Sequence, residues 1–242
     1  MRTLRIILAT LGGNLFIIFG SAVFGTLAIL GSWTRDGDRW VFLMARQWSR
    51  GLLVASGLKL EVAAAPPLDS SRCYVFMSNH QSLYDIPAIL ASLPLPAFFF
   101  AKRSLFQIPI FGWALKAGGF ISIDRRDRSR ARESFAQAVK SLQKGRSTVI
   151  FPEGTRSLHG ELLPFERGGF LLAIKSGAAI VPAGIRGTLE VRKKDGWKVT
   201  PGRIRIAYGR PAETSRFNVR SRGELIEIIE QEIRSLSGLP ER

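Results

Sequence analysis

A stretch without a single charged residue, at residues 6–31, restricts the fold more than any other feature of this sequence. As a helix it would be about 39 Å long at 1.5 Å per residue, which exceeds the roughly 30 Å hydrocarbon core of a bilayer. The stretch is long for the apolar part of a signal peptide, and no small-residue cleavage site is evident near its end. We therefore expect residues 6–31 to be embedded in a membrane.

Glycines at positions 12, 13, 20 and 25 interrupt this stretch. It can therefore be a straight span, a kinked span, or a hairpin that enters and leaves the same leaflet. Arginine alone supplies the charge on its amino-terminal flank, whereas residues 35–39 carry two arginines and two aspartates. This asymmetry favours an amino terminus on the cytoplasmic side, so that a single straight span would put the rest of the chain outside.

A second membrane element is expected at residues 36–54. On a helical wheel, Arg39, Arg46 and Arg50 fall on one side. The opposite side carries Trp40, Met44, Trp48 and Leu52. A helix divided in this way lies in a membrane interface, with arginine near phosphates and tryptophan at headgroup depth. The alternative is a helix that packs on the folded domain with its aromatic side chains in the core.

From residue 59 onward, short apolar runs that predict strands alternate with helical patterns. The expected strands are 58–63, 73–78, 97–101, 120–123, 148–151, 180–185 and 203–208. The sequence thus predicts an α/β fold, with a mixed sheet flanked by helices and an N-terminal membrane-embedded helical segment. We expect residues 1–58 to form the membrane-anchoring helices and residues 59–242 to form one α/β domain.

Two helices between and after these strands have recognisable ends. Residues 131–142 carry apolar side chains at steps of four, three and four, with Gly145 as a C-terminal cap. Ser221 and Glu224 form a candidate capping box before a last amphipathic helix. The single cysteine, Cys73, is expected to be a buried apolar residue of its strand, without a structural disulfide.

Asn79 and His80 follow the apolar strand 73–78, at the strand end where open α/β sheets bind ligands. Asp85 is five residues after His80, so the two side chains cannot meet on a regular helix. A turn followed by a helix with Asp85 in its first turn would fold the carboxylate back onto the imidazole. That contact would fix the tautomer and leave the other ring nitrogen as a base. The alternative is that Asp85 only caps a helix and His80 is an ordinary turn residue.

Taken with three further blocks, this motif resembles the HX4D motif of the glycerolipid acyltransferase family. The blocks are residues 119–125, 151–157 and 180–185, which occur in that family's order. The resemblance covers residues 73–187, and Ser122 stands where these proteins more often carry an apolar residue. It implies that His80 is a general base and that Asp85 holds the imidazole.

The resemblance also implies a reaction. A fatty acyl chain would pass from acyl-CoA or acyl carrier protein, as co-substrate and without another cofactor, to the sn-2 hydroxyl of 1-acylglycerol 3-phosphate (lysophosphatidic acid). No covalent acyl-enzyme is needed, and backbone amides are candidates for holding the developing oxyanion. Both donors are cytosolic. The resemblance therefore favours a shallow or re-entrant arrangement that keeps the catalytic domain on the cytoplasmic side of the membrane.

The block at residues 151–157 is expected to hold the acceptor. Its Gly154 allows a tight turn, the exposed amides around Thr155 can face an anion, and Arg156 offers a fork matched to a phosphate. Arg125 and Lys102, each near a strand end, are the second and third candidate phosphate ligands. Each of these basic residues can instead be a salt-bridged scaffold residue. Glu153 can orient the loop, bind an acceptor hydroxyl, or hold Arg156 or backbone amides.

The formal net charge of +16 indicates a phosphate-bearing partner, either anionic lipid or nucleic acid. No nucleic-acid-binding signature accompanies the charge, so membrane lipids are the expected partner and nucleic acid is not. The sequence carries no serine-nucleophile elbow, dinucleotide fingerprint or phosphate loop, and no spacing that would hold a metal. His159 is expected at the surface. The run Phe98, Phe99 and Phe100 either lines an acyl channel or fills the core.

Two rival functions stay open at this point. The acceptor could be glycerol 3-phosphate or another lysolipid such as a lyso-aminolipid. From a different class, the chain could be a noncatalytic basic protein that binds anionic membrane or nucleic acid.

Overall fold

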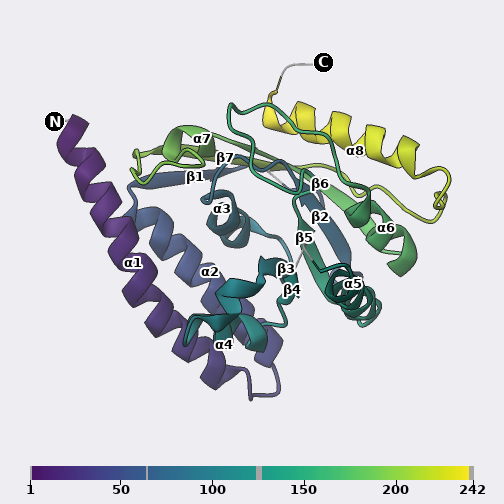
Figure 1. Ribbon diagram of the computed structural model, residues 1–242, viewed down its shortest axis with the longest axis horizontal. Helices are drawn as coiled ribbons and strands as arrows, with labels where there is room; N and C mark the ends of the chain where they lie inside the picture. Colours follow the sequence, from purple (N-terminus) through teal and green to yellow (C-terminus); the bar gives the residue numbers. More distant parts are fainter. Residues whose placement is uncertain (1, 64, 124–126, 240–242) are drawn as a thin grey trace.

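The computed structural model describes residues 2–63, 65–123 and 127–239, and within them the centre is one seven-stranded sheet (Figure 1). The strand order is β1-β7-β6-β2-β5-β3-β4. The strands are β1 (Leu58–Val62), β2 (Tyr74–Ser78), β3 (Ala97–Lys102), β4 (Ile121–Ile123), β5 (Ser147–Ile150), β6 (Ala179–Arg186) and β7 (Gly202–Tyr208). All seven expected strands are present, and each end lies within one residue of its prediction.

Five neighbouring strands, β6, β2, β5, β3 and β4, run parallel to one another. Strand β7 is antiparallel to β6, and β1 is parallel to β7. The sheet is therefore mixed, which confirms the predicted α/β class. Because the five parallel strands share a direction, their carboxyl ends lie along one edge, where ligands bind in sheets of this type.

Helices cover both faces of the sheet. They are α1 (Arg2–Gly31), α2 (Gly37–Ala55), α3 (Asp85–Ser92), the 3₁₀ helix η1 (Arg103–Gln107), α4 (Phe111–Ala117), α5 (Arg128–Gln143), α6 (Arg167–Ser176), α7 (Thr188–Val191) and α8 (Arg222–Ser237). Helices α2 and α3, with α1 outside them, cover one face, while α5, α6 and α8 cover the other (Figure 1). Every residue of β2 is buried: Tyr74 and Phe76 contact the first layer, and Val75 and Met77 contact the second. A central parallel strand with both faces covered has this near-continuous apolar sequence.

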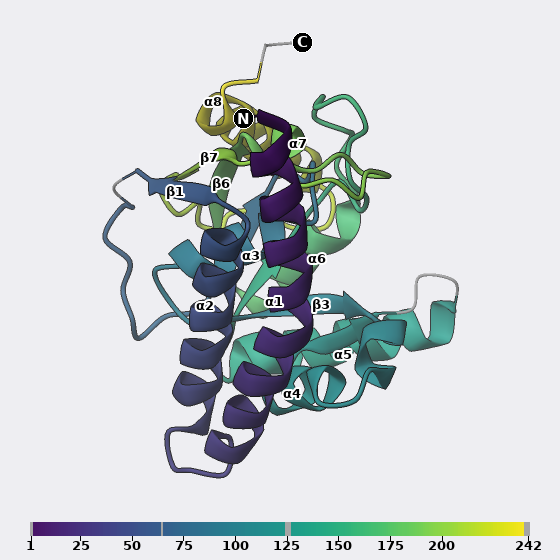
Figure 2. The same cartoon turned by 90° about the vertical axis from the view of Figure 1, so that its left-hand side faces the viewer.

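The N-terminal segment is one unbroken helix, α1, and α2 packs along it (Figure 2). Of the arrangements open from the sequence, a hairpin within residues 6–31 is therefore excluded. Several of the glycines lie in the seam between the two helices. A Cβ atom at Gly12 would be 2.5 Å from the Ala55 carbonyl oxygen, and one at Gly13 would be 2.6 Å from Ser56 Oγ. The glycines thus allow a close approach of the backbones, as small residues do in membrane helices.

The prediction that the apolar side of α2 lies in a membrane interface is wrong. Met44 and Leu52 are buried against α1, and Trp48 Nε1 donates a hydrogen bond to Ser21 Oγ over 3.1 Å. On another side of the helix, Arg46 donates to the carbonyl oxygen of Leu93. The alternative, packing on the rest of the protein, is met in part: Met44 and Leu52 are buried, whereas Trp48 is half-buried and Trp40 stays 39% exposed. A helical wheel alone cannot distinguish the two, because both bury the same face.

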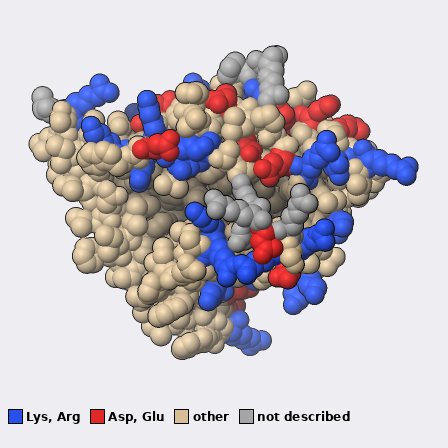
Figure 3. Space-filling view, in the orientation of Figure 1, with Lys and Arg blue, Asp and Glu red and all other residues tan. Residues whose placement is uncertain are grey.

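The outward surface of α1 is apolar, and α1 is long and apolar enough to cross a membrane by length and composition. The exposed apolar surface continues from α1 onto η1 and α4. It includes Leu8, Leu11, Leu15, Ile18, Phe19, Val23, Leu27, Trp33, Leu105, Ile108 and Trp113. Figure 3 shows a broad face without charged side chains over α1, α2 and α4, bordered by a basic cluster.

Two local predictions fail. Ser221 makes no capping hydrogen bond at the start of α8; its Oγ instead accepts from Asn218 N, so the capping box is absent. Cys73 is half-buried and lies just before β2 rather than inside it, although burial still raises the pKa of its thiol. By contrast, α5 ends as expected, with Gly145 at a positive φ of 84°.

Candidate active site

The turn after β2 brings His80 and Asp85 together. Asp85 is the first residue of α3 and is fully buried, and its Oδ2 is 2.7 Å from His80 Nδ1. The same oxygen accepts hydrogen bonds from the backbone N–H groups of Gln81 and Ser82, each over 2.7 Å. Two backbone donors aimed at one carboxylate oxygen fix the position of Asp85, and Asp85 fixes the imidazole. The predicted contact is therefore confirmed, and the alternative of a mere helix cap is insufficient.

The imidazole of His80 is held on a second side by an aromatic ring. Phe151, directly after β5, stacks on it with ring centroids 4.0 Å apart and planes 16° apart. A hydrogen bond donated by Nδ1 to Asp85 Oδ2 leaves Nε2 as the acceptor nitrogen of the neutral imidazole. The side chain of His80 is 14% exposed, so the ring has an opening to solvent.

Asn79 has a role that sequence reasoning missed. Its Nδ2 donates to the Ile185 carbonyl oxygen over 2.9 Å, and its Oδ1 accepts from Ile185 N over 2.8 Å. This pair of bonds ties the carboxyl end of β2 to that of β6 and sets where the turn begins. The sequence signal for this role was an asparagine directly after a buried strand. At that position its side chain can replace the backbone hydrogen bonds between strands that are lost where the turn begins.

Glu153 positions the backbone of the site. Its Oε1 accepts from His80 N over 2.6 Å, and its Oε2 accepts from Leu163 N over 2.9 Å. The side chain is buried, and burial raises its pKa to about 7, against the opposing effect of the hydrogen bonds from the Leu163 and His80 amides. Of the roles considered from sequence, these contacts match the one in which Glu153 holds backbone amides, here those of His80 and Leu163.

The loop of Gly154, Thr155 and Arg156 follows β5. Gly154 has a positive φ of 70°, so the tight turn expected there is present. Arg156 Nη1 donates to the Lys194 carbonyl oxygen over 3.1 Å, and no ion pair joins Arg156 to an acid among the described residues. The next residue, Ser157, donates its N–H to the His80 carbonyl oxygen over 2.8 Å. The loop is thus bound directly to the histidine turn, and the salt-bridged scaffold role considered for Arg156 has no acidic partner in the described part of the chain.

The remaining candidates differ in position. Lys102 is exposed at the carboxyl end of β3, which is separated from β2 by β5, or about 10 Å in strand spacings. Arg125 lies outside the described residues. Phe98 and Phe99 are buried in the core, and His159 is exposed, as expected.

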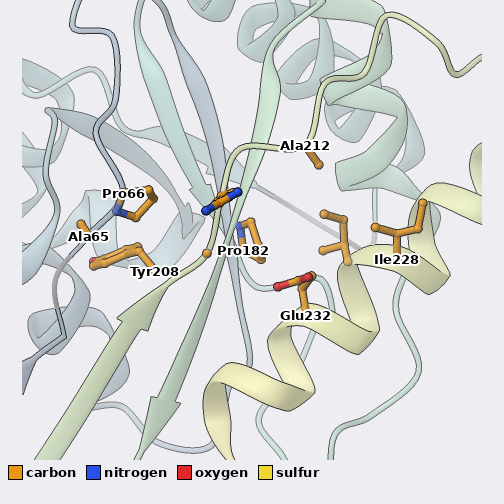
Figure 4. A pocket seen from close by; sticks show the side chains of 10 residues that line it. Ala65, Pro66, Pro182, Tyr208, Ala212, Ile228 and Glu232 are labelled. Atoms are coloured by element: carbon orange, nitrogen blue, oxygen red, sulfur yellow. The ribbon is translucent and has the colours of Figure 1, made fainter.

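A cavity of about 510 Å³ lies elsewhere, lined by residues including Pro182, Tyr208 and Glu232 (Figure 4). None of the described candidate residues lines it. Within residues 2–63, 65–123 and 127–239, no group of three or more His, Cys, Asp or Glu side chains is placed to hold a metal ion.

A family model described as acyltransferase matches residues 59–186, which is more than half of the chain. The chain belongs to the acyltransferase family. The matched region begins in the first strand, contains the His80–Asp85 pair and the loop of Arg156, and ends with β6. The resemblance drawn from the sequence blocks is thereby confirmed.

Curated acyltransferases are similar over parts of their length. The 1-acyl-sn-glycerol-3-phosphate acyltransferase LPAT1 of Arabidopsis thaliana chloroplasts is 36% identical over 60% of this chain and 41% of its own length. The enzyme of that name from Pseudomonas aeruginosa is 34% identical over 64% of this chain and 60% of its own. The chain thus matches about half the length of such relatives.

A solved structure is similar over its whole length. The crystal structure of the 1-acyl-sn-glycerophosphate (LPA) acyltransferase PlsC from Thermotoga maritima matches with a TM-score of 0.85 and 25% sequence identity. The match covers 100% of both chains, so the N-terminal helices are part of the shared fold.

Proposed function

We propose that this acyltransferase transfers a fatty acyl chain from a thioester donor to the sn-2 hydroxyl of 1-acylglycerol 3-phosphate. The observation that carries the proposal is the His80–Asp85 pair, because its geometry leaves one imidazole nitrogen free as a base beside a basic loop. The names of the relatives support the same acceptor.

The proposed mechanism is direct. His80 Nε2 takes the proton of the acceptor hydroxyl while that oxygen bonds to the thioester carbonyl carbon. Asp85 stabilises the imidazolium that forms. Collapse of the tetrahedral intermediate breaks the C–S bond, and the departing sulfur takes the proton from Nε2 to leave as a thiol. His80 is then neutral again, and no bond to the protein has formed.

The acceptor phosphate is assigned to the basic residues beside this pair. Arg156 is on the loop that bonds to the His80 backbone through Ser157, and its planar fork suits two phosphate oxygens. Lys102, at the same edge of the sheet, is a further ligand in this proposal. Gly154 and Thr155 shape the loop. The donor is acyl-CoA or acyl carrier protein, used as a co-substrate without another cofactor.

The proposed membrane arrangement rests on how α1 is held. Thr10, near the amino-terminal end of the apolar stretch, accepts at Oγ1 a hydrogen bond from Val199 N over 2.9 Å, and both residues are buried. A helix bound sideways to the domain cannot stand apart from it as a separate span without breaking this contact. We infer that α1 lies in one leaflet and that the catalytic domain stays on the cytoplasmic side, where both donors occur.

The test is an assay of the purified full chain with acyl-CoA and acyl carrier protein donors and a panel of acceptors. Lysophosphatidic acid should be acylated fastest. If glycerol 3-phosphate or a lyso-aminolipid is preferred, the acceptor assignment is wrong while the acyltransferase chemistry stands. If no acceptor is acylated, the chain is a basic protein that binds anionic membrane or nucleic acid without catalysis.

A further inference from the structure

We propose that Lys194 is an additional phosphate ligand, bound to the loop of Arg156, and that Lys194 and Arg156 together make the site selective for a phosphate monoester. The inference rests on the proposed function and deepens it, because it concerns the acceptor of the same reaction. Lys194 lies outside the region matched by the family model and outside every motif block of the sequence.

Arg156 and Lys194 each donate a hydrogen bond to the backbone of the other. Arg156 Nη1 donates to the Lys194 carbonyl oxygen over 3.1 Å. In return, Lys194 Nζ donates to the Arg156 carbonyl oxygen over 3.0 Å and to Thr155 Oγ1 over 3.3 Å. These three bonds hold the ammonium group against the loop that is assigned to the acceptor phosphate.

The charges of this pair are not neutralised by the protein. Within the described residues, no ion pair joins Lys194 or Arg156 to a carboxylate, and the neighbouring Asp195 is exposed. Toward the described part of the chain, Lys194 uses two of its three N–H donors, both on neutral oxygens, and Arg156 uses one of five. Both cations are held on the same loop contact, and an anion that contacts both gains a favourable interaction with each.

Contacts on both sides fix the segment of Lys194 relative to the catalytic pair. On one side of it, the Arg192 carbonyl oxygen accepts from Ser82 Oγ over 2.7 Å, and Ser82 lies between His80 and Asp85. On the other, Val199 is bound to Thr10 of α1. The position of Lys194 is therefore set by the histidine turn and by the N-terminal helix.

A phosphate monoester carries a charge of about −1.5 to −2 at pH 7, whereas the phosphodiester of a lysophospholipid such as lysophosphatidylcholine carries −1. A site in which two cations contact one phosphate therefore binds the dianion of a monoester more tightly than the monoanion of a diester. Lys194 thus supplies selectivity for lysophosphatidic acid over lysolipids whose phosphate is esterified twice or absent.

The test replaces Lys194 by methionine, which keeps the apolar stem and removes the charge. Lys193→Met is the matched control, because the side chain of Lys193 is exposed and makes no hydrogen bond or ion pair within the described residues. For lysophosphatidic acid, Lys194→Met should raise KM about tenfold to a hundredfold, the range for losing a charged hydrogen bond. For monoacylglycerol and lysophosphatidylcholine, KM should change little. Inorganic phosphate, used as a competitive inhibitor, should lose affinity in the same variant.

The result that overturns the inference is a Lys194→Met variant with the acceptor preference and phosphate inhibition of Lys193→Met. Equal loss on all acceptors would also overturn it, since a merely structural lysine would act through the loop. Lys194→Arg keeps the charge and should restore most of the preference. Failure of the proposed function looks different: the wild type itself would then not prefer lysophosphatidic acid.

Discussion

Replacing Asp85 by asparagine gives the sharpest test of the proposed mechanism. The amide oxygen can take the place of Oδ2 and still accept from Gln81 N, Ser82 N and His80 Nδ1. The new NH2 group then occupies the place of Oδ1, which is buried and has no hydrogen-bond partner among the described residues. The opposite orientation would point NH2 at two backbone donors. The variant therefore keeps the tautomer of His80, loses the negative charge of residue 85, and leaves a buried N–H donor without a hydrogen-bond partner.

The magnitude follows from the lost charge. Two unit charges about 4 Å apart attract by about 4 kcal/mol at an effective dielectric constant of about 20. If the imidazolium of the transition state loses that attraction, the rate falls by about three decades. The stranded donor should also lower the free energy of unfolding by about 1 to 3 kcal/mol. His80→Ala should abolish turnover, because the two carboxyl groups at this turn, Asp85 and Glu153, are buried and bound to backbone N–H groups.

The assay compares kcat for lysophosphatidic acid in the wild type, Asp85→Asn and Asp36→Asn, with the full chain in detergent micelles. Asp36 is exposed and makes no side-chain cap, so its variant controls for charge. Acceptor binding should survive in all three proteins. An Asp85→Asn variant with more than about a tenth of the wild-type kcat would refute the reasoning. So would a burst of acyl-enzyme, because direct transfer forms none.

Three further predictions test other parts of the structure. The stability that protonated Glu153 contributes should be complete below pH about 4.5 and lost as the pH rises through about 7, on the order of 3 kcal/mol. Glu153→Gln should remove this dependence in urea unfolding at pH 5 and 8, whereas Glu133→Gln, at an exposed position of α5, should keep it. Arg156→Lys should clearly slow lysophosphatidic acid turnover, because an ammonium group lacks the two parallel N–H donors of the guanidinium. Arg156→Ala should cost about 2 to 5 kcal/mol in transition-state binding. Equal losses on phosphate-free acceptors would make Arg156 a scaffold residue. Protease added to intact cells should leave residues 59–242 uncut, and high salt should not strip the protein from membranes; cleavage from outside would contradict the cytoplasmic topology.

The strands were predictable because their signal is local. Five of the seven lie in the parallel part of the sheet, and a buried parallel strand such as β2 must be apolar along its whole length, whatever its neighbours are. The His80–Asp85 contact was predictable for a related reason. Their separation excludes a regular helix, and a strand end followed by a helix start leaves few ways for two such side chains to meet.

The failed predictions depended on distant partners. The apolar side of α2 has the same sequence pattern whether it contacts lipid or α1. Only the glycines of α1 at the contact with α2, such as Gly13, indicate that the two helices pack together. Ser221 has the spacing of a capping box, but the turn before α8 is held by Asn218 instead. The Asn218 side-chain oxygen accepts hydrogen bonds from Arg220 N and Ser221 N. Lys194 is one basic residue among many. Its contact with Arg156 joins two loops that are 38 residues apart in the sequence, and a local sequence pattern cannot predict such a contact.

The N-terminal helices and the α/β domain share a core, so the division at residue 58 describes the sequence better than it describes the packing. Ala9 of α1 and Leu53 of α2 belong to the same buried cluster as Tyr84 of the histidine turn. The hydroxyl of Tyr84 is 2.8 Å from Ser56 Oγ, at the point where Gly13 lets α1 approach. Removing α1 would therefore uncover one wall of the turn that joins His80 to Asp85, as well as the Val199 amide that positions the segment of Lys194. The apolar helix α1 thus packs on the turn that joins His80 to Asp85 and binds Val199, five residues after Lys194.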